Sequence, residues 1–573
     1  MTTRRRMSAA LGVVCLASMG WFACGEAGYN GSSSADAGAW SSADASGTLP
    51  ECFSSNECPP GYECSEFGTC VPPSNVTDGG MPPPEVEYEL SDPVSSQSYV
   101  YVAMTAQDSL ARINGATLAV TSFPVGEKPK TVAAAAGSDT AVVLDSINGT
   151  ITIVRPAGGQ DEQTKFKTLP HLNQVVIDPT GSYAVAWFDL NQAIVDAGGL
   201  DAVDQVGSFQ DVTVVALTPG AQTAVDLTVG FRPREVEFDD AGSRAYVITE
   251  HGISIIDLAS VTGPSGPAIV PPLPIGGDPT AEADAVEVDV VSTGNYAVVR
   301  EPNKSEVRIL QLSGANAGSS WTVTLPAVPT DVDLSPDGAR AYAVLRETSQ
   351  LAIIDVPGDG VDPSGLELVD LGGAAVGSLV LTADGNRGAL FTNAVADESI
   401  TIIDLNQTNY PHITWPLEKT IRTVKFSPNG DKLFIIHAKA PGDPDEATNF
   451  DEFIDRSYGY SLFDVASGFA KLQITPVLPG SVAFPDSARL AFVTLDGGDA
   501  EGAVAEVQSI ELDTGVVRRM TLGSPPQAVG ILPGAGVAFV SQRHPLGRIS
   551  FIDVTTGSMR TLTGFDLNSR IID

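Results

Sequence analysis

From about Tyr99 onward, hydrophobic and polar positions along the chain repeat in a fixed order of four beats. An Asp or Asn before Gly closes several of the first beats, and these residues tolerate the positive φ that a tight hairpin turn demands. Each first beat is therefore predicted to be a strand that ends in a turn. The segments are VVIDPTG (175–181), VEFDDAG (236–242), VDLSPDG (332–338), LVLTADG (379–385) and VKFSPNG (424–430).

Three further strands are predicted to follow in each unit. The second reads AYVIT (245–249) or AYAVL (341–345), and the fourth ends near the next turn, as in LTVG (227–230) and MTLG (520–523). The third is the clearest: SIIDL (254–258), AIIDV (352–356), TIIDL (401–405), LFDV (462–465) and FIDV (551–554). Nearly continuous aliphatic strands without helical periodicity indicate sheets that are buried on both faces.

These residues resemble the YVTN family of β-propeller repeats, which is close in shape to WD40-type propellers, over roughly 99–573. The resemblance implies an all-β fold, namely a large β-propeller of repeated four-stranded blades. The period of about 41 to 62 residues lies inside or near the range of propeller blades. An array of β-sandwiches is the alternative, but it would not repeat the same four beats in one order so often.

The repeat also predicts how many blades there are and how the ring closes. First strands are expected near residues 131, 172, 234, 286, 330, 376, 421, 480 and 527, after an opening unit that begins at Tyr99 without a first strand. Ten units exceed the usual four to eight blades, so irregular units or two rings are alternatives. The final SRIID (569–573) stands where another first strand is due, and we expect it to pair with the opening unit.

The beginning of the chain has the pattern of an export signal. Three arginines at positions 4 to 6 precede an apolar run from about Met7 to Ala23, which is too short to span a membrane, so residues 1–23 are predicted to be a signal peptide. The run ends in Trp21-Phe22-Ala23-Cys24, which resembles a bacterial lipobox, although Trp21 and Phe22 depart from the usual residues. The resemblance implies lipid attachment at Cys24. An ordinary signal peptide with a free thiol is the alternative.

A tether, a small cysteine-rich module and a linker are predicted between this signal and the repeats. Residues 24–50 are rich in Gly, Ser, Ala and Asp, and residues 74–98 are rich in Pro, so neither segment can bury a core. Residues 51–73 contain Cys52, Cys58, Cys64 and Cys70 at even spacing, which predicts two disulfides, with zinc as the alternative. The CPPGYEC and GTC fragments resemble small EGF-like modules of bacterial surface lipoproteins.

Charge limits the partners of the chain. Asp and Glu number 70 against 32 Lys and Arg, giving a net charge of −38. Such a chain is repelled by phosphate backbones and anionic headgroups, so we expect no nucleic acid partner and no electrostatic docking on membranes. The membrane partner is expected to be reached through the N-terminal lipid.

Candidate chemistry gathers in two long acidic links between second and third strands, at 189–210 and 438–459, which we expect to crowd one rim. The second link contains oxygen donors of the kind that Ca²⁺ accepts, but not in the order of an EF-hand. A solvated loop is one interpretation and a calcium site the other; no other cofactor is expected. The candidate calcium ligands are Asp443, Asp445, Asn449, Asp451 and Glu452.

No catalytic motif is visible in the sequence. The five histidines, at 171, 251, 412, 437 and 544, fall in different units, and there is no G-x-S-x-G, P-loop or C-x-x-C. The favoured hypothesis is therefore an exported, lipid-anchored protein of the cell envelope, attached to the outer membrane and facing the periplasm or the cell surface. Its propeller is expected to bind a protein or a glycan through acidic loops. A lactonase-like hydrolase or oxidoreductase and a structural cell-surface layer component are the alternatives.

Overall fold

The computed structural model describes residues 94–564 and two short strands at 63–64 and 70–71. Within 94–564, it does not describe 106, 130, 136, 146, 158–160, 204–205, 251, 264, 276–285, 291–292, 357–364, 488 and 499–502. The predicted signal peptide, tether and most of the cysteine module and linker lie outside the described residues.

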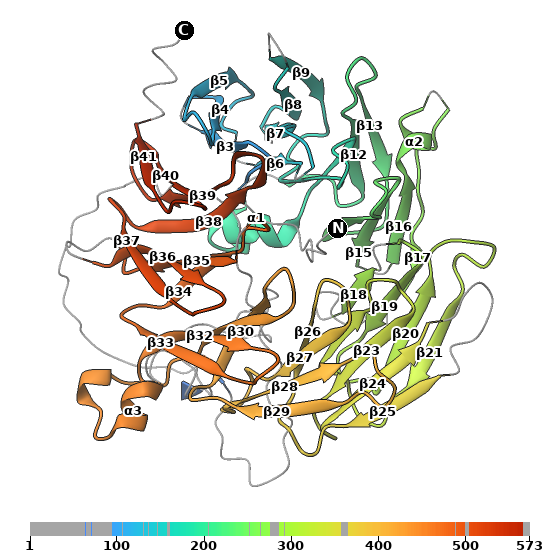
Figure 1. Ribbon diagram of the computed structural model, residues 1–573. Helices are drawn as coiled ribbons and strands as arrows, with labels where there is room; N and C mark the ends of the chain where they lie inside the picture. Colours follow the sequence, from blue (N-terminus) through green and yellow to red (C-terminus); the bar gives the residue numbers. More distant parts are fainter. Residues whose placement is uncertain are drawn as a thin grey trace, which may run out of the picture.

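The described repeats form ten antiparallel sheets, which follow one another around a single ring in chain order (Figure 1). We number these blades 1 to 10. Blade 1 has three strands and the others have four. The chain therefore folds as a ten-bladed β-propeller, which confirms the predicted all-β fold class.

The strands of the first five blades are as follows. Blade 1 contains β3 (Tyr99–Met104), β4 (Ser109–Asn114) and β5 (Val120–Pro124); blade 2 contains β6 (Thr131–Ala134), β7 (Ala141–Asp145), β8 (Thr150–Arg155) and β9 (Glu162–Lys167); blade 3 contains β10 (Gln174–Ile177), β11 (Tyr183–Trp187), β12 (Asp211–Ala216) and β13 (Thr223–Thr228); blade 4 contains β14 (Glu235–Phe238), β15 (Arg244–Thr249), β16 (Gly252–Asp257) and β17 (Leu273–Pro274); blade 5 contains β18 (Glu287–Val290), β19 (Tyr296–Arg300), β20 (Glu306–Gln311) and β21 (Ser320–Thr324).

The remaining blades complete the ring. Blade 6 contains β22 (Asp331–Leu334), β23 (Arg340–Leu345), β24 (Gln350–Asp355) and β25 (Leu366–Asp370); blade 7 contains β26 (Ser378–Leu381), β27 (Arg387–Phe391), β28 (Ser399–Asp404) and β29 (His412–Pro416); blade 8 contains β30 (Ile421–Phe426), β31 (Lys432–His437), β32 (Tyr458–Asp464) and β33 (Ala470–Thr475); blade 9 contains β34 (Pro479–Ala483), β35 (Leu490–Asp496), β36 (Ala505–Glu511) and β37 (Val517–Thr521); blade 10 contains β38 (Pro526–Leu532), β39 (Val537–Gln542), β40 (Arg548–Asp553) and β41 (Met559–Thr563).

Short helices lie in the links. They are α1 (Leu190–Ala197), α2 (Leu258–Val261) and α3 (Phe450–Asp455), with 3-10 turns η2 (Leu200–Ala202), η4 (Pro444–Glu446) and η5 (Pro533–Ala535). None of the helices in the described part of the chain has the length and apolar character needed to cross a bilayer. Outside the ring, β1 (Glu63–Cys64) pairs with β2 (Cys70–Val71).

Glycines close the hairpins between first and second strands, at the predicted turns. In all five turns named from the sequence the glycine itself has positive φ, as at Gly385 (+68°) and Gly430 (+68°). Its N–H donates to the carbonyl three residues earlier, as from Gly430 to Ser427 at 2.9 Å. The expectation that the preceding Asp or Asn takes the positive φ was wrong, because glycine adopts it without a steric cost.

The core lies between neighbouring blades, so each sheet is buried on both faces as predicted. One cluster joins Val298 and Ile309 of blade 5 to Val332 and Ala352 of blade 6, all at most 1 % exposed. Equivalent clusters join the other neighbours around the ring. Burial of such aliphatic side chains stabilises the fold by roughly 1.5–3 kcal/mol each relative to exposure.

Blade 10 packs directly on blade 1 and closes the ring. Leu532 and Phe539 of blade 10 share a buried cluster with Val100 and Ile113 of blade 1. The Gly534 N–H also donates to the Gln97 carbonyl at 2.8 Å. The predicted closing strand at 569–573 lies outside the described residues, so its pairing with blade 1 stays a prediction.

Candidate functional site

The two long acidic links leave the same face of the propeller but do not meet. Successive strands of a blade are antiparallel, so every link from a second to a third strand emerges on one face. The link with α1 belongs to blade 3 and the link with α3 to blade 8, which are five places apart in a ring of ten. Figure 1 shows α1 towards the middle of the ring and α3 at its outer margin. The expected crowding of both links on one rim was therefore wrong.

The link of blade 8, residues 438–459, forms a compact projection that we call the blade 8 arm. Its helix α3 begins at the N-cap Asn449, whose Oδ1 accepts from the Glu452 N–H at 2.9 Å. The Glu452 carboxylate also contacts Arg456 Nη2 at 2.5 Å, one turn later. Capping bonds of this kind stabilise a helix by about 1 kcal/mol, so the sequence fixes the shape of the arm locally.

Three of the five candidate calcium ligands serve local structure in the arm. Asp443 caps the turn η4 through the Asp445 N–H at 2.9 Å, and Asn449 and Glu452 cap and brace α3 as described above. Among the described residues no group of three or more His, Cys, Asp or Glu side chains is arranged to hold a metal ion. Calcium binding by the arm stays a prediction from the sequence.

A buried lysine anchors the arm to the propeller. Lys419 is 1 % exposed, and its Nζ donates to the carbonyls of Ile454 at 2.6 Å and Asp455 at 3.0 Å, at the C-terminal end of α3. Burial lowers the pKa of Lys419 to about 8, against the opposing effects of Asp455 and Glu398. A cation at the C-terminus of a helix satisfies carbonyls that have no partner within the helix. The arm is thus fixed at both ends of α3.

The outer surface of the arm is acidic and carries an aromatic side chain. Phe450 is 72 % exposed and stacks on Phe453, with the ring centroids 6.4 Å apart. Asp443, Asp445, Glu446 and Asp451 of the same arm are also exposed. A large apolar side chain held in water on a rigid support can supply the buried centre of a contact with another molecule.

A serine and a histidine of blade 8 form a hydrogen bond that resembles the pair of a nucleophilic enzyme. Ser461 Oγ lies 2.7 Å from His437 Nε2, and His437 Nδ1 lies 3.0 Å from the Thr420 carbonyl. Because a carbonyl only accepts, Nδ1 carries the proton and Nε2 accepts from Ser461. Both side chains are at most 2 % exposed, so no substrate reaches them. Burial lowers the pKa of His437 to about 4 and keeps the ring neutral.

The other histidines that the structure describes, His171, His412 and His544, do not form a centre with His437. His412 Nδ1 lies 3.1 Å from the Tyr410 carbonyl on the outer strand of blade 7, and His544 Nδ1 accepts from the Leu546 N–H at 3.1 Å. His171 has a φ of +63° in the link before β10. His251 lies outside the described residues.

The N-terminal sites predicted from the sequence fall mainly outside the described residues. These are the lipid attachment site Cys24 and the disulfide candidates Cys52 and Cys58. The remaining two, Cys64 and Cys70, stand opposite each other in the register of β1 and β2. Lipid attachment and the two disulfides stay predictions.

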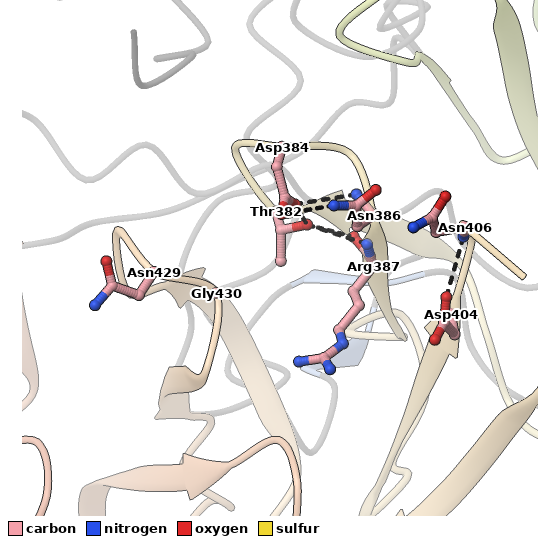
Figure 2. A pocket seen from close by; sticks show the side chains of 8 residues that line it. All are labelled: Thr382, Asp384, Asn386, Arg387, Asp404, Asn406, Asn429 and Gly430. Atoms are coloured by element: carbon pink, nitrogen blue, oxygen red, sulfur yellow. Dashed lines mark hydrogen bonds between the residues drawn. The ribbon is translucent and has the colours of Figure 1, made fainter. Parts of the chain in front are cut away.

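A polar pocket of about 270 Å³ lies on the opposite face, between blades 7 and 8. Three turns build it: 382–387 and 404–406 of blade 7, and 429–430 of blade 8 (Figure 2). Gly430 lets these turns approach closely, because a Cβ there would meet Thr382 Cγ2 at 2.7 Å. Sequence reasoning missed the pocket, since its residues come from turns that are assigned to strand ends rather than to chemistry.

Turn hydrogen bonds fix the carboxylates of this pocket. Asp384 Oδ1 accepts from Thr382 Oγ1 at 2.7 Å and from the Asn386 N–H at 3.1 Å, while Asn386 Nδ2 donates to Oδ2 at 2.8 Å. Although partial burial acts in the opposite direction, these bonds hold the pKa of Asp384 below its ordinary value. The pocket therefore offers the Asp384 carboxylate and the Asn386 amide in fixed positions.

No protein-family model matches the chain, and no curated protein is similar to it in sequence. Among solved structures it is similar to the dihydro-heme d1 dehydrogenase NirN, at 11 % identity over 75 % of this chain and 74 % of that one, with a TM-score of 0.40. It is also similar to a eukaryotic initiation factor (10 %, 82 % and 97 %, 0.44) and to the β-propeller domain of Cps50 (Swd1) from Myceliophteria thermophila (13 %, 57 % and 96 %, 0.30). These likenesses concern the fold alone.

Proposed function

We propose that the protein is a lipid-anchored binding protein of the cell envelope, whose propeller presents the blade 8 arm to a partner protein. The observation that carries the proposal is the 72 % exposed Phe450 on an acidic arm that is anchored through the buried Lys419. The predicted export signal and the lipobox-like sequence that ends at Cys24 support the compartment and the anchor.

Rigidity of the arm favours binding. Ordering a flexible loop on association costs roughly 0.5–1.5 kcal/mol for each immobilised side chain. The caps of α3 and the bonds from Lys419 already order the arm when the chain folds, so much of this cost does not arise on binding. A partner then gains the full contact of Phe450 without having to order the arm.

Charge around Phe450 defines the partner. Four exposed acids share the arm with an exposed aromatic side chain, and in interfaces of this composition charge selects and steers a partner while the aromatic centre supplies affinity. The complementary surface is a protein patch with Lys or Arg around an apolar pocket. The net charge of −38 disfavours a polyanion as the partner.

The test places a photoreactive crosslinker beside Phe450 in the intact lipoprotein and compares Phe450→Ala with Phe469→Ala in native envelopes. Phe469 is 66 % exposed in a turn on the opposite face of the same blade, which makes it a matched control. We expect one basic partner, lost with Phe450→Ala, retained with Phe469→Ala and released by salt. Equal capture by both variants would remove the arm from the interaction.

The anchor is tested separately by labelling with palmitate. Wild type is expected to incorporate the label and Cys24→Ala to lose it, because the thiol of Cys24 is the proposed attachment point. Incorporation in both proteins would refute the assignment of Cys24.

A further inference from the structure

The pocket between blades 7 and 8 is built around a basic side chain that recurs from blade to blade. A basic residue stands at or beside the start of the second strand in blades 6 to 9, as Arg340, Arg387, Lys432 and Arg489. In blade 7 the register places Arg387 opposite Asp404, the last residue of the third strand. The recurrence allows the four blades to be compared at one position.

Three of these four basic side chains are held by the protein. Lys432 Nζ pairs with the Asp464 carboxylate. Arg489 Nη2 contacts Asp431 Oδ2 at 2.5 Å and Asp513 Oδ1 at 2.7 Å. In blade 6, the Nη1 of the arginine donates to the Leu405 carbonyl at 2.9 Å. The basic side chain at this position therefore usually connects two strands or two neighbouring blades.

Arg387 is the exception. Among the described residues its guanidinium has no hydrogen bond and no ion pair; only its backbone is bonded, to Thr382. Asp404, its register partner, instead accepts from the Asn406 N–H at 3.0 Å and from Gln407 Nε2 at 2.5 Å. Figure 2 shows the Arg387 side chain extending between the turns of the two blades, with no dashed line at the guanidinium.

We propose that this pocket binds a saccharide that carries one carboxylate, such as a hexuronate. The Arg387 guanidinium takes the carboxylate through two parallel N–H donors. The side-chain amides of Asn386, Asn406 and Asn429 bind ring hydroxyls, for which they offer both donors and acceptors. The volume of about 270 Å³ accommodates one sugar ring.

The flanking acids decide the charge of the ligand. Asp384 and Asp404 line the same pocket as Arg387, so the site carries two carboxylates and one cation. A phosphate dianion is repelled there, whereas hydroxyl groups donate to the remaining lone pairs of both acids. A single negative charge with several hydroxyls is the composition that satisfies all of these groups.

The test compares glucuronate with glucose, which share the ring and differ at the carboxylate. Binding to the intact protein is followed by saturation-transfer NMR and by calorimetry, with wild type, Arg387→Gln and Arg244→Gln. Arg244 occupies the same position in blade 4, opposite Asp257, and lines a cavity with apolar walls. We expect glucuronate to bind wild type and Arg244→Gln at least tenfold more tightly than glucose, and Arg387→Gln to lose this preference.

Three results would overturn the proposal: no binding of glucuronate to wild type, an unchanged preference in Arg387→Gln, or inorganic phosphate competing as well as glucuronate. Thermal unfolding of each variant checks that the substitutions leave the fold intact. The pocket and the blade 8 arm lie on opposite faces, so sugar binding is measured independently of partner capture by Phe450. Either proposal can therefore fail without the other.

Discussion

Blades 8 and 10 place different side chains in the same slot between their second and third strands. In blade 8, His437 accepts from Ser461 at 2.7 Å. In blade 10, Gln542 and Ser550 occupy the equivalent register positions, and Gln542 Nε2 donates to Ser550 Oγ at 2.8 Å. The Gln542 amide thus takes the place of the His437 imidazole as the partner of a serine hydroxyl. The amide donates its hydrogen bond, whereas the imidazole accepts it.

Two other blades extend the comparison. The slot contains Glu301 and Arg308, 3.8 Å apart, in blade 5, and the apolar Leu345 and Ala352 in blade 6. The slot therefore requires side chains that fill its volume and whose polar groups have partners, but it does not require one type of side chain. A hydrogen-bonded serine and histidine indicate a nucleophile only where a substrate can reach them, and here the repeat itself supplies the structural explanation.

The largest expected effect follows from emptying the slot in blade 8. His437→Ala leaves a cavity and removes the partner of a buried hydroxyl, so the free energy of unfolding should fall by about 2–4 kcal/mol. Chemical denaturation measures the loss, with His544→Ala, at a half-buried position outside the slot, as a control that is expected to change little. An equal effect of the two substitutions would contradict the structural role of His437.

The second largest effect is expected from acid, which should destabilise blade 8 through His437 but not blade 10 through Gln542. The pKa of His437 is about 4 in the folded protein and near 6.5 in the unfolded chain. The unfolded chain binds the proton first, so stability is lost as the pH falls from 6.5 towards 4, by at most roughly 3 kcal/mol. Unfolding curves at pH 7 and 4.5 should show a smaller loss in His437→Gln than in wild type. Parallel losses would place the acid sensitivity elsewhere.

Removing only the hydroxyl should cost less. Ser461→Ala leaves the imidazole in place but deprives Nε2 of its donor, for an expected loss of about 1–2 kcal/mol. Thr401→Ala in blade 7 is the matched control, since that hydroxyl bonds Thr414 at 2.8 Å instead of a ring nitrogen. Only Ser461→Ala is expected to raise the folded-state pKa of His437, which NMR titration measures.

The smallest effect is expected from placing in blade 8 the glutamine that blade 10 has at this position. His437→Gln should cost under about 1.5 kcal/mol, because the amide can donate to Ser461 as Gln542 donates to Ser550. The reciprocal substitution Gln542→His should make the stability of blade 10 sensitive to acid. Denaturation curves at two pH values check both substitutions, and a severe loss from His437→Gln at pH 7 would show that blade 8 needs the ring.

Local repetition made the fold predictable. First strands expected near 131, 330 and 527 begin at Thr131, Asp331 and Pro526, because glycine turns and β-branched runs mark each unit independently of the rest of the chain. The three-stranded opening blade follows from the same pattern.

The candidate sites were harder to foresee, because they depend on distant pairs. Lys419 bonds residues 35 and 36 places further along, and Ser461 meets His437 across the whole arm. The pocket combines turns of two blades, and the state of Arg387 appears only when it is compared with Lys432 and Arg489 in three dimensions. An alignment of the repeats by strand register could have pointed to the slot of His437 and Ser461 and to the position of Arg387.

The way in which the chain joins the ring has a mechanical consequence. Ser96 Oγ donates to Asp139 Oδ1 of blade 2 at 2.7 Å, the Ser98 N–H donates to the same oxygen at 2.9 Å, and Gln97 accepts from Gly534 of blade 10. Tension arriving along the preceding segment is thus divided between two blades before it reaches β3. A propeller held by the predicted tether and linker can in this way bear a pull without peeling β3 from the ring.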